Sequence, residues 1–280
     1  MEEKLLQMKS LVERLNQASD SYYNGKGELM TDYEWDALFD QLKRLEEETG
    51  EILPDSPTNR VSEDSIVGKK EEHEFAALSL AKTKQVSDLV KWAEDRPIWI
   101  SWKLDGLTLV VTYDGGKLTK IVTRGNGHIG TNITHLAPAI SGIPANISEK
   151  GHLVVRGEAV ISYADFEQFI IESEGDYANP RNLASGSLTL KDIEEVKQRH
   201  IQWIPFTLVY TERELTSWGE RMQMLKDLGM NPVERERIDH PTTENIQLEI
   251  DKFTEKVTSK KNPFPVDGLV ICYDDTVYAA

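Results

Sequence analysis

The stretch Trp99-Ile-Ser-Trp-Lys103-Leu-Asp-Gly106-Leu-Thr-Leu-Val-Val-Thr-Tyr113 is the part of the chain that decides its fold and its chemistry. Apolar residues lead up to Lys103, the chain turns at Gly106, and apolar residues then resume as a second strand. A lysine that is partly desolvated beside a carboxylate can lose its proton near neutral pH and act as a nucleophile. The simpler alternative is a surface lysine followed by an Asp-Gly turn. The rest of the chain favours the nucleophile.

Composition limits the classes of protein to which the chain can belong. Its 280 residues are 39% hydrophobic and 29% charged, which suits one large globular domain or one large and one small. The only cysteine, Cys272, excludes a disulfide within the chain. The charged N-terminus is unlike a signal peptide, and no apolar run reaches the ~18 residues that a membrane helix needs. We expect a monomeric cytoplasmic protein that has no membrane segment.

The formal net charge of -16 argues against tight DNA binding by this chain alone. Contacts to phosphates need clustered lysine and arginine side chains. Net charge does not describe local patches, so a role in DNA processing stays open if other parts of a longer protein grip the duplex.

Hydrophobic periodicity divides the chain into two parts. Residues 1–49 predict helices, with Thr31 as the N-cap of the second and a capping box to Glu34. The segment from residue 62 to residue 70 is polar, and we expect a domain boundary there, with domains over 1–68 and 69–280. The second part predicts a hairpin over 107–113 and 117–123, strands over 153–161, 201–210 and 266–273, and helices over 162–172 and 217–228.

Five stretches carry side chains that suit nucleotide binding. Aromatic faces and carboxylates suit a cationic ring, glycines allow close backbone approach, and arginine pairs with phosphate. The stretches are Tyr22-Tyr23-Asn24 with Asp32-Tyr33-Glu34-Trp35-Asp36 and residues 54–61; Leu78-Ser79-Leu80; Lys103-Leu104-Asp105-Gly106 with Thr123-Arg124-Gly125-Asn126-Gly127; Val155-Arg156-Gly157-Glu158 with residues 178–188; and residues 264–272.

In order and spacing, these stretches resemble the N-terminal half of bacterial NAD-dependent DNA ligases, from about residue 5 to the last residue. Residues 54–61, Pro-Asp-Ser-Pro-Thr-Asn-Arg-Val, are similar to the family's P-D-S-P-T-x-R-V. This is the most specific signature, because ATP-dependent ligases lack the helical domain that carries it. The resemblance implies an α+β fold. A small helical domain that binds nicotinamide mononucleotide (NMN) precedes a nucleotidyltransferase, or adenylation, domain with antiparallel sheets flanked by helices.

The resemblance also implies a role for each matching residue. Lys103 and Asp105 are the expected catalytic residues, with Lys103 attacking NAD. Glu158 is expected to bind a ribose hydroxyl or a water bound to Mg²⁺, Arg181 to organise phosphate, and Phe206 to stack on adenine. The full set of expected NAD-binding residues is Tyr22, Tyr23, Asp32, Asp36, Ser79, Leu80, Arg124, Glu158, Arg181, Phe206 and Asp267.

Four positions depart from the family pattern. Cys272 replaces a lysine near the phosphate, Ser101 a glutamate, Asn126 an aspartate and Thr189 an arginine. Alternation from Asp267 predicts Leu269, Ile271 and Tyr273 on one face of a strand and Gly268, Val270 and Cys272 on the other. A lysine at 272 is therefore predicted to speed adenylation, unless Cys272 packs in the core or another cation replaces the lost charge.

The sequence thus predicts the adenylation region of an NAD-dependent DNA ligase, which performs the first step of nick joining in replication and repair. Its expected partners are NAD, Mg²⁺ and, in a full-length enzyme, nicked duplex DNA. We expect a fragment of a longer ligase that does not seal nicks by itself. One alternative is a catalytically impaired, ligase-like NAD-binding module. A second alternative is a nucleotidyltransferase that uses ATP or GTP, but the presence of the helical domain argues against it.

Overall fold

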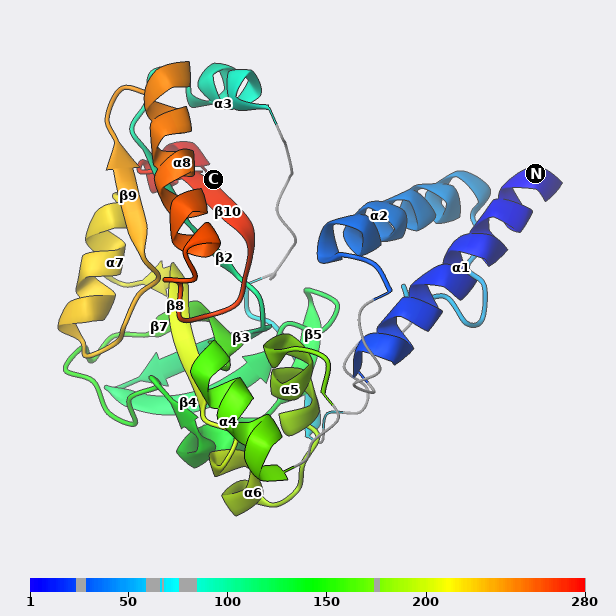
Figure 1. Cartoon of the computed structure of the whole chain (residues 1–280), viewed down its shortest axis with the longest axis horizontal. Coiled ribbons are helices and arrows are strands. Elements are labelled where there is room, and N and C mark those ends of the chain that lie inside the picture. The colour runs from blue at the N-terminus through cyan, green and yellow to red at the C-terminus, as the bar shows by residue number, and fades with distance from the viewer. Residues whose placement is uncertain (24–28, 59–65, 67, 76–84, 174–176, 280) are drawn as a thin grey trace.

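The computed structural model describes residues 1–23, 29–58, 66, 68–75, 85–173 and 177–279. A pair of helices comes first, followed by two sheets with helices packed against them (Figure 1). This confirms the expected α+β class. Among the described residues, no helix is both long and apolar enough to cross a membrane.

The first two helices have an apolar core of their own. Helices α1 (Glu2–Tyr23) and α2 (Asp32–Thr49) bury Met8, Leu15 and Leu42 between them. The hydroxyl oxygen of Thr31 accepts a hydrogen bond from the Glu34 amide at 3.1 Å, so the predicted N-cap of α2 is confirmed.

The Pro-Asp-Ser-Pro segment fastens the chain to both of these helices. The buried Ser56 hydroxyl donates to Glu46 Oε1 at 2.6 Å, and the Thr58 hydroxyl donates to the same oxygen at 2.9 Å. The Asp55 carbonyl accepts from the Asn16 side chain at 2.8 Å. The described part of the signature therefore stabilises the helix pair, while residues 59–61 lie outside the described residues.

Among the described residues, the larger sheet has seven strands in the order β1-β5-β4-β3-β7-β8-β6, and all pairs are antiparallel except β6 with β8. Its hairpin is as predicted, because Gly115 and Gly116 take φ values of 59° and 78° between β3 and β4. The strands are β1 (Lys69–Glu72), β3 (Leu107–Asp114), β4 (Lys117–Thr123), β5 (Ile129–Asn132), β6 (Ile140–Ser141), β7 (Leu153–Val160) and β8 (Ile201–Thr211).

Helices cover the larger sheet and complete its core. The helices that contribute are α4 (Tyr163–Ser173), α5 (Pro180–Ser187), α6 (Ile193–Lys197), α7 (Trp218–Asp227) and the 3₁₀ helix η1 (Thr134–Ala139). Ser162 and Ser217 cap α4 and α7, where the sequence predicts these helices to begin. Ile66 is 3% exposed and packs in this core, although the expected boundary assigns it to the helical domain. The boundary itself stays a prediction.

The smaller sheet carries the nucleophile strand at its centre. Strand β2 (Ile98–Leu104) lies between β10 (Val266–Tyr273) and β9 (Arg235–Ile238), and α9 (Thr276–Ala279) follows β10. Helices α3 (Val86–Ala93) and α8 (Thr243–Thr258) lie beside this sheet (Figure 1). Their apolar side chains pack with Ile98, Ile100 and Trp102. Since side chains alternate along a strand, Lys103 lies on the opposite face of β2.

A β-bulge interrupts β10 near its start. Val266 pairs with Leu104 and Leu269 with Trp102, so the register shifts across Asp267 and Gly268. The predicted alternation holds from Leu269 onward, because Leu269 and Ile271 pack in the smaller core. It fails at Asp267, whose side chain meets Lys103 on the other face. The extra residue in a bulge reverses the side on which the preceding residue emerges.

Candidate active site

Lys103 forms an ion pair with Asp267. Its Nζ atom lies 3.2 Å from Asp267 Oδ2, and the two side chains are 32% and 26% exposed. Lys103 comes from the end of β2, and Asp267 comes from the bulge of β10. The bulge therefore brings together two residues that the sequence predicted for this site. A partly exposed amine beside a carboxylate can be reached by a ligand and has a proton acceptor at hand.

The turn after Lys103 is tightly packed. The Asp105 amide donates to the Pro265 carbonyl at 2.9 Å, and the Gly106 amide donates to Glu158 Oε2 at 3.2 Å. A Cβ atom at Gly106 would lie 2.0 Å from the Ala159 carbonyl oxygen. A glycine is needed here because the turn is pressed against β7.

Glu158 lies on β7, contacts the turn after Lys103 and holds that turn in place. The Thr108 hydroxyl donates to Glu158 Oε1 at 2.8 Å. Burial raises the pKa of Glu158 from its ordinary value of 4.5 to about 7, against the opposing effect of hydrogen bonds from Thr108 and the Gly106 amide. Thr108 is a supporting residue that the sequence analysis missed, although it follows Gly106 by only two positions.

The raised pKa of Glu158 makes stability depend on pH. A carboxyl group whose folded pKa is higher than its unfolded pKa favours folding below about 4.5, and that contribution is lost as pH rises through about 7. The unfolding free energy of Glu158→Gln minus that of wild type should therefore increase as pH rises from 5 to 8, by up to about 3 kcal/mol. Thermal unfolding of both proteins across this range checks the slope. A constant difference would contradict the raised pKa.

Arg181 connects two parts of the chain. It is the second residue of α5, whose start is fixed by the Asn179 cap and by Pro180. Its Nε atom lies 3.2 Å from Asp105 Oδ1, and its Nη1 atom forms an ion pair with Asp32, the first residue of α2. The Arg181 side chain is only 14% exposed. The helix pair is thus joined to the nucleophile turn through one guanidinium group.

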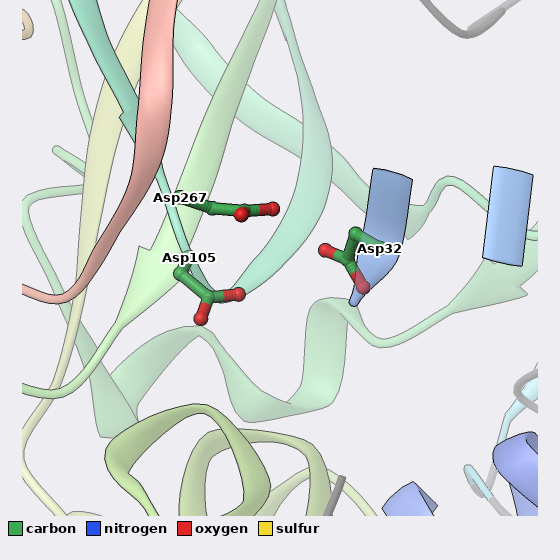
Figure 2. A group of neighbouring side chains, drawn as sticks. All are labelled: Asp32, Asp105 and Asp267. Atoms are coloured by element: carbon green, nitrogen blue, oxygen red, sulfur yellow. The ribbon is translucent and has the colours of Figure 1, made fainter. Parts of the chain in front are cut away.

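Three aspartates meet at this point, as Figure 2 shows. A carboxylate oxygen from each of Asp32, Asp105 and Asp267 lies within 4.8 Å of the other two. Carboxylate oxygens are the ligands that Mg²⁺ prefers, so the donor set fits this ion. Glu158, the residue that the sequence suggested for a metal, is not a member of this group.

The expected phosphate-binding turn after β4 is built by backbone contacts. Gly125 has a φ of 59°, and a Cβ atom there would lie 1.9 Å from the Ile129 carbonyl oxygen. The Asn126 side-chain oxygen accepts from the amides of His128 and Ile129 at 2.9 and 2.8 Å. A ring nitrogen of His73 lies 2.8 Å from the Arg124 carbonyl. Arg124 itself is partly buried at the start of this turn.

The other expected NAD-binding residues lie elsewhere or outside the described residues. Asp36 is one helical turn from Asp32 on α2, and Phe206 on β8 packs against the smaller core. Tyr22 and Tyr23 belong to α1, but their side chains are outside the description. Ser79 and Leu80 lie outside the described residues. The roles of all these residues stay predictions.

Comparison with known proteins decides the family. Residues 69–279 match the model of the NAD-dependent DNA ligase adenylation domain. The chain belongs to this family. Residues 1–62 match the DNA ligase-like, N-terminal NAD⁺-binding domain. The resemblance stated from the sequence is therefore confirmed.

The named relatives of this adenylation-domain protein are longer than the chain itself. A DNA ligase of Lachnoclostridium phytofermentans is 38% identical over 99% of this chain and 43% of its own length. A DNA ligase of Leptospira biflexa is 35% identical over 95% of this chain and 40% of its own length. The chain thus spans less than half of these relatives. Among solved structures, mycobacterial DNA ligase D complexed with ATP and MES has a TM-score of 0.43 and 16% identity, and the match covers 71% of this chain and 55% of that chain.

Two of the four departures named from the sequence, and a further one at Trp35 in the helix pair, have local structural explanations. The Asn126 side-chain oxygen caps its turn as an aspartate oxygen would. The Thr189 hydroxyl donates to the Gly186 carbonyl at 2.6 Å and so helps to end α5. Trp35, where the family has tyrosine, donates from its indole to the Leu15 carbonyl at 3.2 Å and stacks on Phe39. It therefore packs inside the helix pair.

Cys272, another of the four departures, packs against the larger core. Its strand partner across the sheet is Trp99, whose indole N–H donates to Asp274 Oδ1 at 2.8 Å. Burial raises the pKa of the Cys272 thiol to about 12. The structure therefore favours the alternative in which Cys272 is a packing residue, because a lysine would have to extend past the fixed Trp99 ring.

Cys272→Lys should destabilise the protein without speeding adenylation. Adding bulk to a packed site costs about 1–3 kcal/mol, and the new charge would begin in apolar surroundings. We expect a lower melting temperature and a single-turnover adenylation rate no higher than that of wild type, with Cys272→Ala as the control for loss of the thiol. Faster adenylation by a folded Cys272→Lys protein would show that the lysine reaches the phosphate after all.

Proposed function

We propose that Lys103 takes the adenylyl group from NAD and releases NMN, as the first step of DNA nick joining. The observation that carries this proposal is the convergence of Lys103, Asp267, Asp105 and Arg181 at one point, in a chain of the adenylation family. A nucleophile, a proton acceptor and a phosphate-binding cation are the groups that such a transfer requires.

The transfer forms one bond and breaks one. The Lys103 nitrogen bonds to the adenylyl phosphorus, and the bond from that phosphorus to the bridging oxygen of NMN breaks, with its electrons leaving on NMN. Lys103 must lose its proton for this, and Asp267 at 3.2 Å is the carboxylate placed to accept it. Arg181 supplies positive charge beside the transferring group, which Cys272 cannot do.

Asp32, Asp105 and Asp267 would hold a magnesium ion, whose chemistry is to neutralise charge on the phosphates. We infer that Glu158 accepts a hydrogen bond from a ribose hydroxyl, because its carboxylate lies beside the nucleophile turn. Phe206, Arg124, Asp36, Tyr22, Tyr23, Ser79 and Leu80 complete the NAD site that we propose, on the strength of the family match.

The whole protein would act on nicked duplex DNA in the cytoplasm. The names of the longer relatives support a DNA substrate, and the partly buried lone cysteine suits a reducing compartment. The alternative, a module that binds NAD without reacting, rests on the missing lysine at position 272. The presence of Lys103, Asp267 and Arg181 in one cluster favours the enzyme.

The direct test is to incubate the purified chain with NAD and Mg²⁺ and to measure its intact mass. We expect the mass to increase by one AMP, with NMN released in equal amount. ATP in place of NAD should give little or no adduct. Binding of NAD without any adduct would favour the non-reacting module, and adduct formation from ATP but not from NAD would contradict the proposed donor.

A further inference from the structure

The ring of His73 holds the backbone of Arg124 in the turn that follows β4. His73 comes directly after β1, and its ring atom Nε2 lies 2.8 Å from the Arg124 carbonyl oxygen. The same oxygen accepts the Gly127 amide at 3.0 Å within the turn. A carbonyl oxygen only accepts hydrogen bonds, so Nε2 carries the hydrogen and donates. A side chain from another strand thus fixes the place of Arg124.

The amide side of Arg124 is fixed to the nucleophile turn. The Arg124 amide donates to the Thr108 carbonyl at 3.2 Å, and the Thr108 hydroxyl donates to Glu158 Oε1 at 2.8 Å. Glu158 also accepts the Gly106 amide at 3.2 Å. Hydrogen-bonded residues therefore form a continuous path from His73, through the Arg124 backbone, to the nucleophile turn.

His73 donates without adding a charge. Burial lowers the pKa of His73 from its ordinary value of 6.5, against the opposing effect of hydrogen bonds to backbone carbonyls. The positive charges of Arg156 and Lys120 lower this pKa further. A neutral imidazole keeps one N–H. A lysine or arginine at position 73 would also donate, but it would add a positive charge beside Lys120, Arg124 and Arg156.

We propose that His73 is a positioning residue for the adenylyl transfer, and that it acts through Arg124. Its hydrogen bond sets the point from which the Arg124 side chain contacts NAD. An error of about 1 Å in the placement of such a group can cost about 10²-fold in rate. This inference rests on the proposed function and goes beyond it, because it names a residue that supports the reaction without touching NAD.

A purely structural role for His73 predicts a different result. The His73 amide donates to the His128 carbonyl at 2.6 Å and so continues the pairing of β1 with β5. This backbone contact survives replacement of the side chain. If the ring only stabilised the sheet, its loss would lower the melting temperature, and any fall in adenylation would multiply with the effect of losing the Arg124 side chain.

A double-mutant cycle separates the two roles, because His73 contacts the backbone of Arg124. Arg124→Ala removes the guanidinium group but keeps the carbonyl. In single-turnover adenylation at low NAD, we expect His73→Ala to lower the rate by about fivefold to tenfold, the value of one hydrogen bond. Arg124→Ala should lower it by about 10²-fold. In the double variant, the loss of His73 should have no further effect.

Three other variants make the comparison specific. His73→Gln keeps a neutral N–H donor with a similar reach and should restore most of the wild-type rate. His73→Leu keeps bulk without a donor, and it takes the place of His73→Ala in the cycle if that variant does not fold. His128→Ala removes an exposed imidazole from the same turn and should react at the wild-type rate.

Three outcomes overturn the inference: a wild-type rate in folded His73→Ala or His73→Leu, losses that multiply in the double variant, or a His73→Gln protein as slow as His73→Ala. A wild-type chain that forms no adduct with NAD contradicts the proposed function instead. Calorimetric binding of NAD to the four proteins of the cycle then decides the inference. A loss of affinity that disappears without the Arg124 side chain supports it, and an absent or independent loss overturns it. Wild type that neither reacts with NAD nor binds it overturns both.

Discussion

Lys103→Ala should abolish formation of the AMP adduct from NAD. The proposed chemistry attaches the nucleotide to the Lys103 nitrogen, so no other group in the site replaces it. Removing a covalent nucleophile costs on the order of 10⁶-fold in kcat in a well-measured protease. Mass spectrometry of the intact protein and of its peptides checks both the loss of the adduct and its position in wild type.

Two control variants make the result specific. Lys103→Arg keeps a positive charge beside Asp267 but provides no amine nucleophile, so it should also fail to react. Lys120→Ala removes another partly exposed lysine, which pairs with Glu71 at 3.0 Å on the larger sheet. It should react at the wild-type rate. An adduct on Lys120, or an adduct that persists in folded Lys103→Ala, would mean that the nucleophile has been misassigned.

Deletion of residues 1–62 should have the second largest effect. It removes the helix pair, and with it Asp32 and Asp36, from the side of the site where NMN is expected to bind. Contacts to a non-reacting part of a substrate position the reacting atoms, so their loss should lower adenylation by NAD by about 10²-fold or more. Radiolabelled adenylate transfer from NAD measures the fall.

The deletion is placed so that the remaining protein keeps its core. Ile66 packs with the larger sheet and is retained, whereas a cut after residue 68 would remove it. The helix pair buries its apolar residues within itself, so its removal exposes little of the other cores. Cooperative thermal unfolding of the truncated protein is the control. Undiminished adenylation of a folded truncated protein by NAD would refute the role of the helix pair.

Local features were predictable from sequence because they depend on neighbouring residues. The hairpin at Gly115 and Gly116 and the Thr31 cap of α2 follow from turn and capping chemistry within a few positions. The family motifs placed Lys103 and Asp267 in one site, and the structure puts them 3.2 Å apart.

Features that depend on distant contacts were not predictable. The bulge that turns Asp267 toward Lys103 contradicts simple alternation, and its only sequence signal is a glycine inside a strand, Gly268. The ion pair of Asp32 with Arg181 joins residues far apart in the chain. The burial of Glu46 under Ser56 and Thr58 likewise has no local pattern. Pairing between remote segments is set by the packed fold, which residue spacing alone does not encode.

The chain passes from the smaller sheet to the larger one within the two residues between β2 and β3, Asp105 and Gly106, which begin two positions after Lys103. This two-residue connection holds the end of β2 and the start of β3 together, so a rotation of the two sheets about an axis near it is the one that strains the connection least. Points near an axis move least. A nucleotide attached to Lys103 would therefore stay almost stationary while the outer ends of both sheets swing, so the protein could change its grip on a large substrate without displacing the phosphorus that it carries.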